Sequence, residues 1–262
     1  MSELVSREER DQALFDEIAA SYARKDITPS SSFARRAQIL HVVRPILAQL
    51  GDVGTVLEIG CGVGAPATYL TGHYQRYIGV DQSGAMIETA RLFNRNQRNV
   101  EFIADNVKTA PLPDDTADVV LSVGALHHMT ELDDVMQRLT RLAKPGALFL
   151  LIEPQNGNPL IQVLRRLRTQ VDASYSSEQI YFSEQELRVL VERHGLRELD
   201  VTFYGYLSTP FAQVVLNPQA LTLPLSRIAV RIDEWLYRNL RGPLCRLSFN
   251  IVVTGICDKQ TR

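Results

Sequence analysis

The sequence predicts an α/β fold in which helices cover both faces of a mostly parallel, doubly wound sheet. Apolar runs that suit strands alternate with helical segments up to Glu153, and such alternation is typical of parallel sheets with right-handed crossovers. The run at 117–123 is almost continuously apolar, as expected for a strand buried on both faces. The first strand enters a glycine-rich turn at 60–64 (Gly-Cys-Gly-Val-Gly), and the second strand ends in Asp81. This pairing is how α/β sheets hold a nucleoside-bearing ligand, because glycines let backbone N–H groups approach it and a carboxylate can accept hydrogen bonds from ribose hydroxyls.

The first half of the chain contains two predicted helices and then the first three strands. Apolar side chains recur at helical spacing in 13–23, and the polar loop at 28–32 precedes a second helix at 33–50 that Gly51 ends. Strands are predicted at 55–60, 76–81 and 100–104. The helices between them begin near Ala65, with Pro66 in the first turn where a missing N–H is harmless, and at 84–97.

The second half continues the alternation as far as Glu153 and then changes. A strand at 117–123, a helix at 132–143 and a strand at 147–153 are followed by a loop at 154–159 and a short basic helix at 160–169. Ser183 and Glu186 have capping-box spacing and open a helix to His194. Two late strands, 199–206 and 249–256, enclose an insertion at 208–247 with an amphipathic helix at 225–240. We therefore expect a helical lid at 1–50 and a main domain at 51–262 that carries this insertion as a cap.

Composition limits the class of protein. With 262 residues and 45% hydrophobic content, one sizeable domain with a full core is expected. The net charge of −2 gives no overall attraction to nucleic acid. Cys61, Cys245 and Cys257 have neither metal-ligand spacing nor a disulfide framework, which favours a reducing cytoplasm and no bound metal. The acidic, polar N-terminus is unlike a secretory signal, and no stretch approaches a spanning helix. We expect a soluble, cytoplasmic chain.

Five ordered segments at regular spacing resemble the class I S-adenosylmethionine-dependent methyltransferases of the small-molecule type. The resemblance covers residues 15–153 well and the rest only in outline. The matching segments are Val56-Leu-Glu-Ile-Gly-Cys-Gly-Val-Gly64 with Val80-Asp81, Ala104-Asp105, Pro111-Leu-Pro113, Val120-Leu-Ser-Val-Gly-Ala-Leu-His-His-Met129, and Leu142-Ala-Lys-Pro-Gly146. The family resemblance implies a Rossmann-like sheet of seven strands with an antiparallel last strand, helical cap insertions, and S-adenosylmethionine as the cofactor.

Carried over residue by residue, the resemblance also implies a cofactor site. The glycine turn would lie beneath the methionine portion, with Glu58 supporting the side that faces the amino group, and Asp81 would accept the ribose hydroxyls. Gln82 or Met86 would pack near the adenine, Asp105 would accept from its amino group beside the Asn106 N–H, and Val123 with Gly124 would lie near the sulfonium. The cofactor positions are Glu58, Gly60, Gly62, Gly64, Asp81, Gln82, Met86, Asp105, Asn106 and Val123. Other roles stay open: Asp105 suits an Asx-turn and Met86 a plain core position.

The candidate catalytic residues follow the fourth and fifth strands. His127 and His128 lie at the carboxyl edge of the sheet, where α/β folds bind ligands, and a neutral imidazole near pH 7 can take a proton from a hydroxyl acceptor. The alternative is that both histidines only position the loop and the cofactor. Glu153 ends the fifth strand and suits three roles: orienting a histidine, binding the acceptor, or capping the loop after it.

The less typical parts of the chain are expected to select the acceptor. The segment 15–22 resembles a lid that closes over the cofactor, and an aromatic wall would suit a partly apolar acceptor. The candidate wall residues are Tyr22, Phe33, Tyr181, Tyr204 and Phe211, although aromatic residues at helical or strand spacing are more often part of the core.

Arginines beside the apolar insertion allow three interpretations. They could contact a membrane surface, they could be ordinary solvated charges, or the insertion could form a homodimer. These arginines are Arg165, Arg166 and Arg168, and Arg227, Arg231, Arg238, Arg241 and Arg246.

The function predicted from the sequence is methyl transfer to a small, partly apolar molecule, first at oxygen, then at nitrogen, then at carbon of a quinone- or lipid-like acceptor. A nucleic-acid substrate is disfavoured because no basic face or reader module is present. A protein that only senses S-adenosylmethionine is one rival. An NAD(P)-dependent oxidoreductase is the other, since the glycine turn and Asp81 also fit a dinucleotide. It is disfavoured because the chain has no Tyr-x-x-x-Lys pair and Pro66 removes a donor at the helix start.

Overall fold

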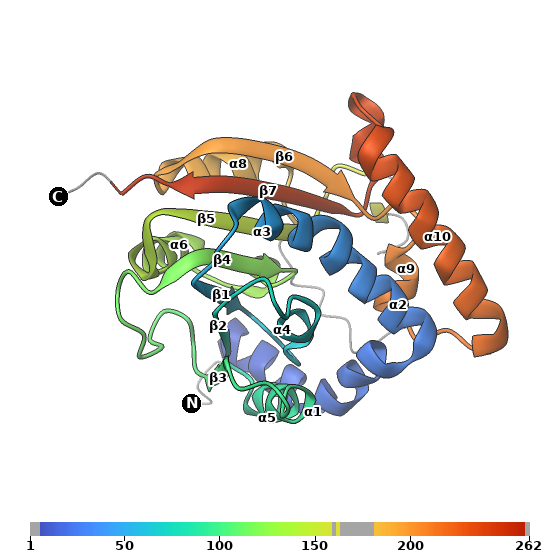
Figure 1. The fold of residues 1–262 in the computed structure, drawn as a ribbon, viewed down its shortest axis with the longest axis horizontal. Coiled ribbons are helices and arrows are strands. Elements are labelled where there is room, and N and C mark those ends of the chain that lie inside the picture. Colours follow the sequence, from blue (N-terminus) through green and yellow to red (C-terminus); the bar gives the residue numbers. More distant parts are fainter. Residues whose placement is uncertain (1–5, 159–160, 163–180, 260–262) are drawn as a thin grey trace.

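The computed structural model describes residues 6–158, 161–162 and 181–259, and its centre is a seven-stranded sheet (Figure 1). The strands follow the order β3-β2-β1-β4-β5-β7-β6, and β7 runs antiparallel to both of its neighbours. The expected seven-stranded, doubly wound sheet with an antiparallel last strand is confirmed. The strands are β1 (Thr55–Ile59), β2 (Arg76–Asp81), β3 (Val100–Ala104), β4 (Ala117–Val123), β5 (Ala143–Pro154), β6 (Leu196–Tyr204) and β7 (Asn250–Cys257).

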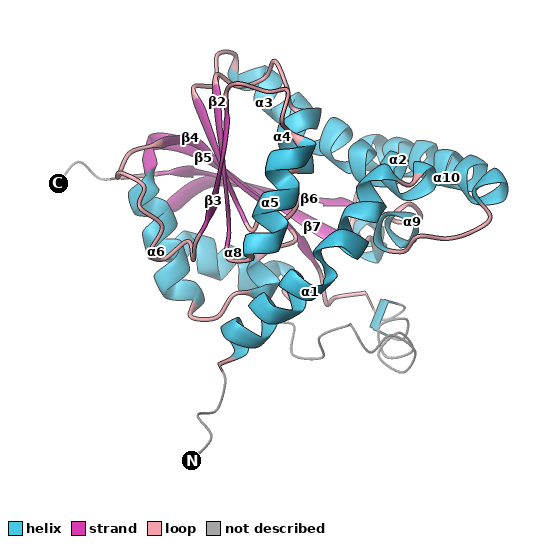
Figure 2. Cartoon of the chain, turned by 90° about the horizontal axis from the view of Figure 1, so that it is seen from below, coloured by secondary structure: helices cyan, strands magenta, loops and turns pink. Residues whose placement is uncertain are grey.

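Helices cover both faces of this sheet (Figure 2). Leu139 of α6 and Leu187 of α8 belong to the core on one face, while Leu47 of α3 and Ile87 of α5 belong to the core on the other. Each of these four helices therefore buries one apolar side against the sheet, as a layered α/β fold requires. The helices are α1 (Arg7–Ile27), α2 (Pro29–Gln38), α3 (Arg44–Leu50), α4 (Ala65–Tyr69), α5 (Gly84–Phe93), α6 (Leu132–Leu142), α8 (Glu184–Arg193), α9 (Thr209–Gln213) and α10 (Gln219–Asn239).

The second predicted helix, 33–50, is longer and less regular than expected. It begins at Pro29, and a π-helical turn at Ile39–Val43 separates α2 from α3. Pro45 lies at the start of α3 and has no N–H to donate to the preceding turn, which accounts for a local change of helical hydrogen bonding here. Gly51, with a φ of 76°, ends α3 as predicted.

Other differences lie at the ends of elements. Helix α1 extends beyond the predicted 13–23 on both sides, because Ser6 and Glu9 form a capping box that the apolar pattern does not report. The predicted capping box of Ser183 and Glu186 opens α8. Helix α10 starts six residues before the predicted 225 and includes Pro224. The predicted basic helix at 160–169 lies almost wholly outside the described residues.

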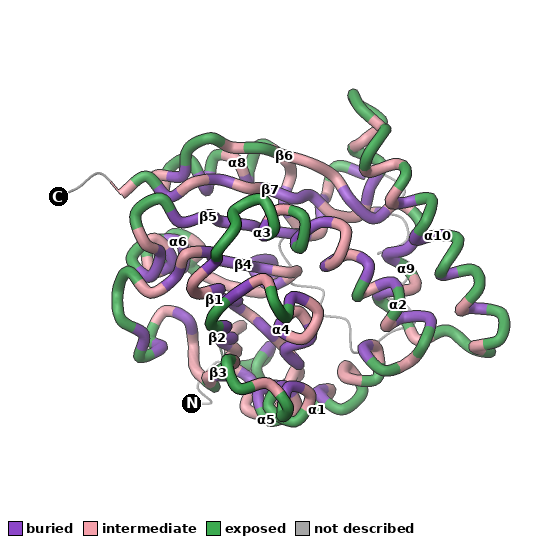
Figure 3. Tube along the Cα trace, viewed as in Figure 1, coloured by how far each residue is buried: buried purple, intermediate pink, exposed green. Residues whose placement is uncertain are grey.

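The N-terminal helices pack against the predicted insertion. Ala34 and Ala37 of α2 share a small apolar cluster with Val230 of α10 and Ala212 of α9, and the Ser226 hydroxyl donates to the Ser30 carbonyl oxygen at 2.8 Å. The buried carboxylate of Asp233 on α10 accepts hydrogen bonds from Leu207 and Ser208 at the start of α9. In the tube view the inner side of α10 is buried and its outer side exposed (Figure 3). Within the described ranges, no helix has the length and apolarity to cross a bilayer.

Candidate active site

A cavity of about 510 Å³ lies at the carboxyl ends of the central strands. Its floor includes residues that end or follow β1, β2 and β4, among them Gly60, Asp81 and Val123. Helix α1 contributes Phe15, Ile18 and Tyr22 from the other side, and in Figure 2 it passes the lower ends of the strands. The parallel strands thus bring separate parts of the sequence together at one edge, where α/β folds bind ligands.

The glycine turn after β1 brings the backbone close to the cavity. Gly62 has a φ of 50°, and a Cβ there would lie 3.9 Å from Tyr22, so a side chain at this position would occupy the space between the turn and α1. Gly64 begins α4 with a φ of 66°, and a Cβ would lie 2.7 Å from the Phe102 ring. Gly60 and Gly62 line the cavity, whereas Gly64 lies behind it.

Asp81 joins the second strand to this turn. One of its carboxylate oxygens accepts the Gly62 N–H at 2.8 Å, and the other accepts the Ser83 N–H at 2.9 Å. Burial raises the pKa of Asp81 above its ordinary value, although these two hydrogen bonds act in the opposite direction. Each carboxylate oxygen still has a lone pair to offer, because a carboxylate accepts about four hydrogen bonds. Asp81 can therefore accept ligand hydroxyl groups while it holds the turn in place.

Glu58 lies beneath the turn and does not line the cavity. It is almost fully buried, and the Tyr77 hydroxyl donates to its Oε2 at 2.6 Å. Burial raises the pKa of Glu58 to about 8, with a smaller opposing effect of the Tyr77 hydrogen bond. Its side chain is therefore protonated at neutral pH and supports the strand beneath the turn.

An ion pair on the far wall of the cavity was missed by the sequence reasoning. Arg35 of α2 donates from Nε to Oδ1 of Asp26 at 2.8 Å, and both side chains line the cavity. The Asp26 side chain is only 1% exposed, and its other oxygen, Oδ2, has no hydrogen-bond partner among the described residues. Burial alone would lower the pKa of Arg35, but Tyr22 and Asp26 raise it, so the guanidinium stays charged. This wall offers one positive and one negative group to a ligand.

The loops after β2 and β3 form the opposite end of the cavity. Gln82, Met86, Asp105 and Asn106 all line it. Asp105 Oδ1 also accepts from the Asn106 N–H and the Thr109 hydroxyl, but the Asx-turn here is made by the next residue, since the Asn106 side chain accepts the Lys108 N–H. Both hydrogen bonds of Asp105 go to Oδ1, so its carboxylate keeps an oxygen for a ligand.

Helix α1 is fastened to these loops by polar side chains. Glu8 accepts hydrogen bonds from Lys108, Asn106 and Thr130. The Gln12 side chain donates to the Gln82 carbonyl oxygen at 3.0 Å, and Asp16 accepts from Ser83. These contacts hold α1, which includes the segment 15–22 predicted to be a lid, against the loops that line the cavity.

His127 and Glu153 form a buried pair next to the cavity. His127 Nδ1 lies 2.9 Å from Glu153 Oε2, while Glu153 Oε1 accepts from the Ser122 hydroxyl and from the N–H groups of Ala125 and Leu126. Burial would raise the pKa of Glu153, but the hydrogen bonds from His127, Leu126 and Ser122 outweigh it, so the pKa is lowered. An ionised Glu153 accepts a hydrogen bond from Nδ1–H, and this favours the tautomer in which Nε2 is the basic nitrogen of the ring.

His128 lies on the side of the cavity that faces α1. Its ring contacts Phe15 edge-on at 5.0 Å between centroids, and its Nδ1 is 3.7 Å from Asp11 Oδ2. The two imidazoles lie 4.1 Å apart between centroids. The paired histidines therefore have different surroundings. The Glu153 carboxylate orients His127, whereas helix α1 packs on His128.

Of the five aromatic candidates for the acceptor wall, two line the cavity and three do not. Tyr22 and Tyr181 line the cavity, and the Tyr181 ring stacks on His127 at 6.2 Å. Tyr204 is buried in the sheet core beside His41, Phe211 packs on the α2–α10 cluster, and Phe33 lies under Arg227 on the surface. None of these three lines the cavity, because Tyr204 and Phe211 pack in apolar clusters beside it and Phe33 is partly exposed on the surface.

Of the cofactor and catalytic candidates, those that line the cavity are Gly60, Gly62, Asp81, Gln82, Met86, Asp105, Asn106, Val123, His127 and His128. Glu58, Gly64 and Glu153 support these residues from behind. Asp26 and Arg35 were missed because isolated charges on helices usually face solvent. The one available signal is that Tyr22 and Asp26 are four residues apart, which places both on the same side of α1.

Comparisons with known proteins bear on the family and the fold of the chain. Residues 57–151 match the family described as methyltransferase domain. The chain is 30% identical over 142 residues to the uncharacterized methyltransferase YcgJ of Bacillus subtilis, a match that covers 50% of this chain and 56% of that protein. It is 33% identical over 97 residues to a fatty-acid O-methyltransferase of Mycolicibacterium smegmatis, covering 36% of this chain and 35% of that protein. The chain thus spans about a third to a half of the length of the first curated relatives that it matches.

The fold has a counterpart over nearly its whole length. A crystal structure of an S-adenosylmethionine-dependent methyltransferase from Thermotoga maritima superposes with a TM-score of 0.66 at 18% sequence identity. The superposition covers 94% of this chain and 99% of that one. At this identity the likeness establishes the shared fold.

Proposed function

We propose that the protein transfers a methyl group from S-adenosylmethionine to a small, partly apolar acceptor, at an oxygen atom, on the premise that residues 57–151, which match a methyltransferase domain, are of the class I S-adenosylmethionine-dependent type. The observation that carries the choice of oxygen is the 2.9 Å pair of His127 and Glu153, because a hydroxyl acceptor must lose a proton and this pair can take it.

The donor set of the cavity fits this cofactor. Arg35 suits the carboxylate of a methionyl group, and the unpartnered Oδ2 of Asp26 suits its ammonium. Gly62 offers a close backbone approach, Asp81 can accept from the ribose hydroxyls, and Asp105 with Met86 would hold the adenine. When bound, S-adenosylmethionine supplies a methyl group already activated by the sulfonium.

The chain's own residues then supply alignment and a proton acceptor. Helix α1 covers one side of the cavity, which would limit the access of water and favour a productive in-line approach of the acceptor. His127 would take the hydroxyl proton on Nε2 and so make the acceptor oxygen nucleophilic. Glu153 holds the ring in place and stabilises the imidazolium that forms. Proton transfer of this kind accelerates reactions by roughly a hundredfold or more.

Apolar side chains in the lining of the cavity support an apolar acceptor. Among them are Val214 and Pro210 at α9, with Ile161 and Phe249. The relative from Mycolicibacterium smegmatis is named for a fatty-acid acceptor, which agrees with such a lining. We therefore place a partly apolar molecule with a hydroxyl or carboxyl oxygen first among acceptors.

Transfer to nitrogen or carbon is the second candidate. Tyr181 stacked on His127 would suit a ring-shaped acceptor of the quinone or natural-product type, and the same base could then remove a proton from a carbon or a nitrogen. The position of the methyl group in the product separates these candidates from oxygen transfer.

Titration calorimetry with S-adenosylhomocysteine and with NADH tests the cofactor assignment. We expect binding of S-adenosylhomocysteine only, since the wall of Arg35 and Asp26 matches a zwitterion. Binding of NADH alone would favour an oxidoreductase. Binding of S-adenosylhomocysteine, with no methyl transfer to any of a panel of hydroxylated apolar molecules and no effect of His127 substitution, would favour a sensor.

A further inference from the structure

Helix α10 presents an apolar stripe to solvent. Ile228 is 53% exposed and Trp235 is 62% exposed, although residues of this type are usually buried. They belong to a row with alternating spacings of four and three residues, so that the members project from the same side of the helix. The stripe is Leu221, Leu225, Ile228, Ile232 and Trp235.

The stripe lies on a helix that is fixed in place by packing, and not on a frayed helix end. The inner side of α10 is fixed by Ser226, Val230 and Asp233, all buried against α2 and the start of α9. Figure 1 shows the helix along one edge of the molecule, with its outer side turned away from the sheet. A contiguous apolar row on such a rigid element marks an interaction site.

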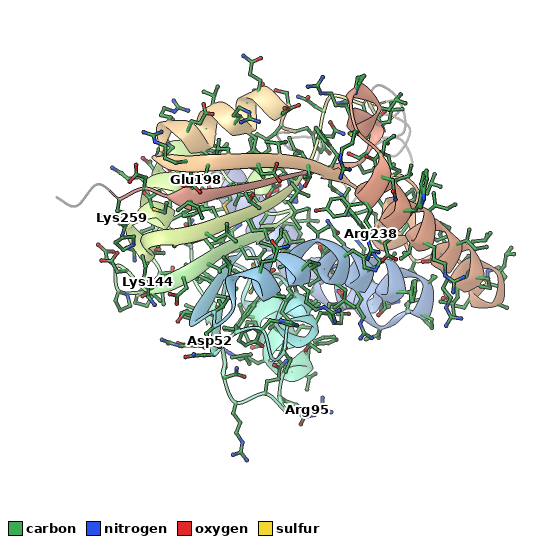
Figure 4. All side chains as sticks on the ribbon, turned by 45° about the horizontal axis from the view of Figure 1, so that its top comes forward. Asp52, Arg95, Lys144, Glu198, Arg238 and Lys259 are labelled. Carbon is green, nitrogen blue, oxygen red and sulfur yellow. The ribbon has the colours of Figure 1, made fainter. Side chains whose placement is uncertain are left out.

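A row of arginines accompanies the stripe along one edge. Arg227, Arg231 and Arg238 are four and seven residues apart, so they too lie on one side of the helix, directly next to the stripe. All three are exposed, and Arg238, labelled in Figure 4, extends from the last part of α10. Within the described part of the chain, Arg227 and Arg231 have no carboxylate partner, while Arg238 pairs with Glu234 at 2.7 Å.

The stripe continues toward the mouth of the cavity. Val214 lines the cavity and is also 40% exposed, so it lies at the rim. Leu216 follows, exposed as well, and the chain then enters α10 a few residues before Leu221. Exposed apolar side chains therefore connect the rim with the outer side of α10.

We propose that the outer side of α10 docks on an anionic lipid bilayer, with the stripe in the acyl boundary and the arginine row at the headgroup phosphates. Apolar side chains flanked by cations are the composition of helices that lie in a membrane interface. Docking would bring the rim at Val214 next to the membrane, so that an apolar acceptor passes from the bilayer into the cavity. This last step rests on the proposed function; the docking does not.

The arrangement of charge favours lipid over a second copy of this chain. Two copies could pair through the stripe with their α10 helices antiparallel and related by a two-fold axis. The arginine-bearing edges of the two helices would then lie on the same side of the interface, so the two arginine rows would face each other. Like charges placed opposite each other oppose association. Phosphate groups of an anionic membrane instead complement the row.

The fluorescence of Trp235 tests the docking directly, because it is the one tryptophan of the chain. The full-length protein is titrated with vesicles of equal parts phosphatidylcholine and phosphatidylglycerol, and with vesicles of phosphatidylcholine alone. We expect a blue shift and co-sedimentation with the anionic vesicles, both weakened by added salt. Ile228→Ser is expected to weaken binding about tenfold. Arg231→Gln is expected to weaken it about fivefold.

Matched controls lie elsewhere on the surface. Leu92→Ser removes an equally exposed leucine of α5, and Arg98→Gln removes an exposed arginine before β3; neither should change vesicle binding. The proposal is overturned by three results. These are an unchanged Trp235 spectrum with anionic vesicles, a shift that follows protein concentration without vesicles and so reports a dimer, and equal binding to both vesicle types that Arg231→Gln leaves intact. None of these measurements depends on methyl transfer. A negative result for vesicle binding is therefore distinct from a negative result for S-adenosylhomocysteine binding, which tests the proposed function.

Discussion

Arg35 and Asp26 pair at 2.8 Å on the cavity wall, yet only one carboxylate oxygen of Asp26 is used. A buried carboxylate oxygen without a hydrogen-bond donor costs free energy unless a ligand supplies one. The pair therefore presents a guanidinium and an unsatisfied acceptor side by side, an arrangement suited to an amino acid zwitterion. This feature gives the most direct way to test what the cavity binds.

Substituting Arg35 by Met should weaken binding of S-adenosylhomocysteine by roughly tenfold to a hundredfold, the usual effect of losing a charge-assisted hydrogen bond. Binding of 5′-methylthioadenosine, which lacks the amino acid part, should change little. Calorimetry with both ligands measures the two effects. Equal losses for the two ligands would show that Arg35 acts on the fold of the site and not on the methionyl group.

Asp81→Asn should weaken S-adenosylhomocysteine by a similar factor, because the amide has only one acceptor oxygen for the Gly62 N–H, the Ser83 N–H and the ribose. Adenine alone, which has no ribose, serves as the control ligand and should bind as before. A variant with unchanged affinity for S-adenosylhomocysteine would remove Asp81 from the sugar site.

His127→Asn should lower kcat by about a hundredfold or more while leaving S-adenosylhomocysteine binding intact. Glu153→Gln should give a smaller loss, because the ring keeps a hydrogen bond but loses the charge that stabilises the imidazolium. The pH profile of kcat is the second readout, and the rise with pH that a basic imidazole causes should vanish in His127→Asn.

His194 offers a matched control for that experiment. It pairs with Asp133 at 2.8 Å and neither residue lines the cavity, so His194→Asn should keep both kcat and its pH profile. If His127→Asn behaves like His194→Asn, the imidazole is not the base.

Glu58→Gln should change how stability depends on pH. The folded-state pKa of about 8 lies above the ordinary 4.5, so the contribution of Glu58 to stability is complete below about pH 4.5 and is lost as the pH rises toward 8. The loss is on the order of 5 kcal/mol for a shift of this size. Urea unfolding at about pH 5 and about pH 8 should show a steep fall for the natural protein and a shallower one for Glu58→Gln. Parallel falls in both proteins would place the titration elsewhere.

Much of the fold could be predicted because its signals are local. The strands from β1 to β4 are short apolar runs bounded by turn residues, and their predicted bounds match the structure to within a residue. The helix ends were predicted less accurately where a local signal, such as a proline, conflicts with tertiary packing. Pro224 lies within α10 although proline commonly ends helices, because packing of Ser226 and Val230 against the N-terminal helices holds the helix in place.

The cavity could be predicted only where it is built from consecutive segments. The glycine turn, Asp81 and the paired histidines each follow a strand, so the parallel sheet brings them to one edge. Arg35 and Asp26 come from helices outside the sheet, and their meeting depends on how α1 and α2 pack. The same limit applies to Tyr204 and Phe211, whose aromatic rings gave no indication of which side of the sheet or helix they would face.

Asp233 ties the outer helix to the wall of the cavity. Its carboxylate accepts the N–H groups of Leu207 and Ser208 and the Ser208 hydroxyl, so the first turn of α9 cannot shift without α10. Exchanging α9 alone for the equivalent segment of another protein would leave a buried carboxylate without donors. Redesign of the acceptor side therefore has to transplant Ser208 through Asp233 as one module.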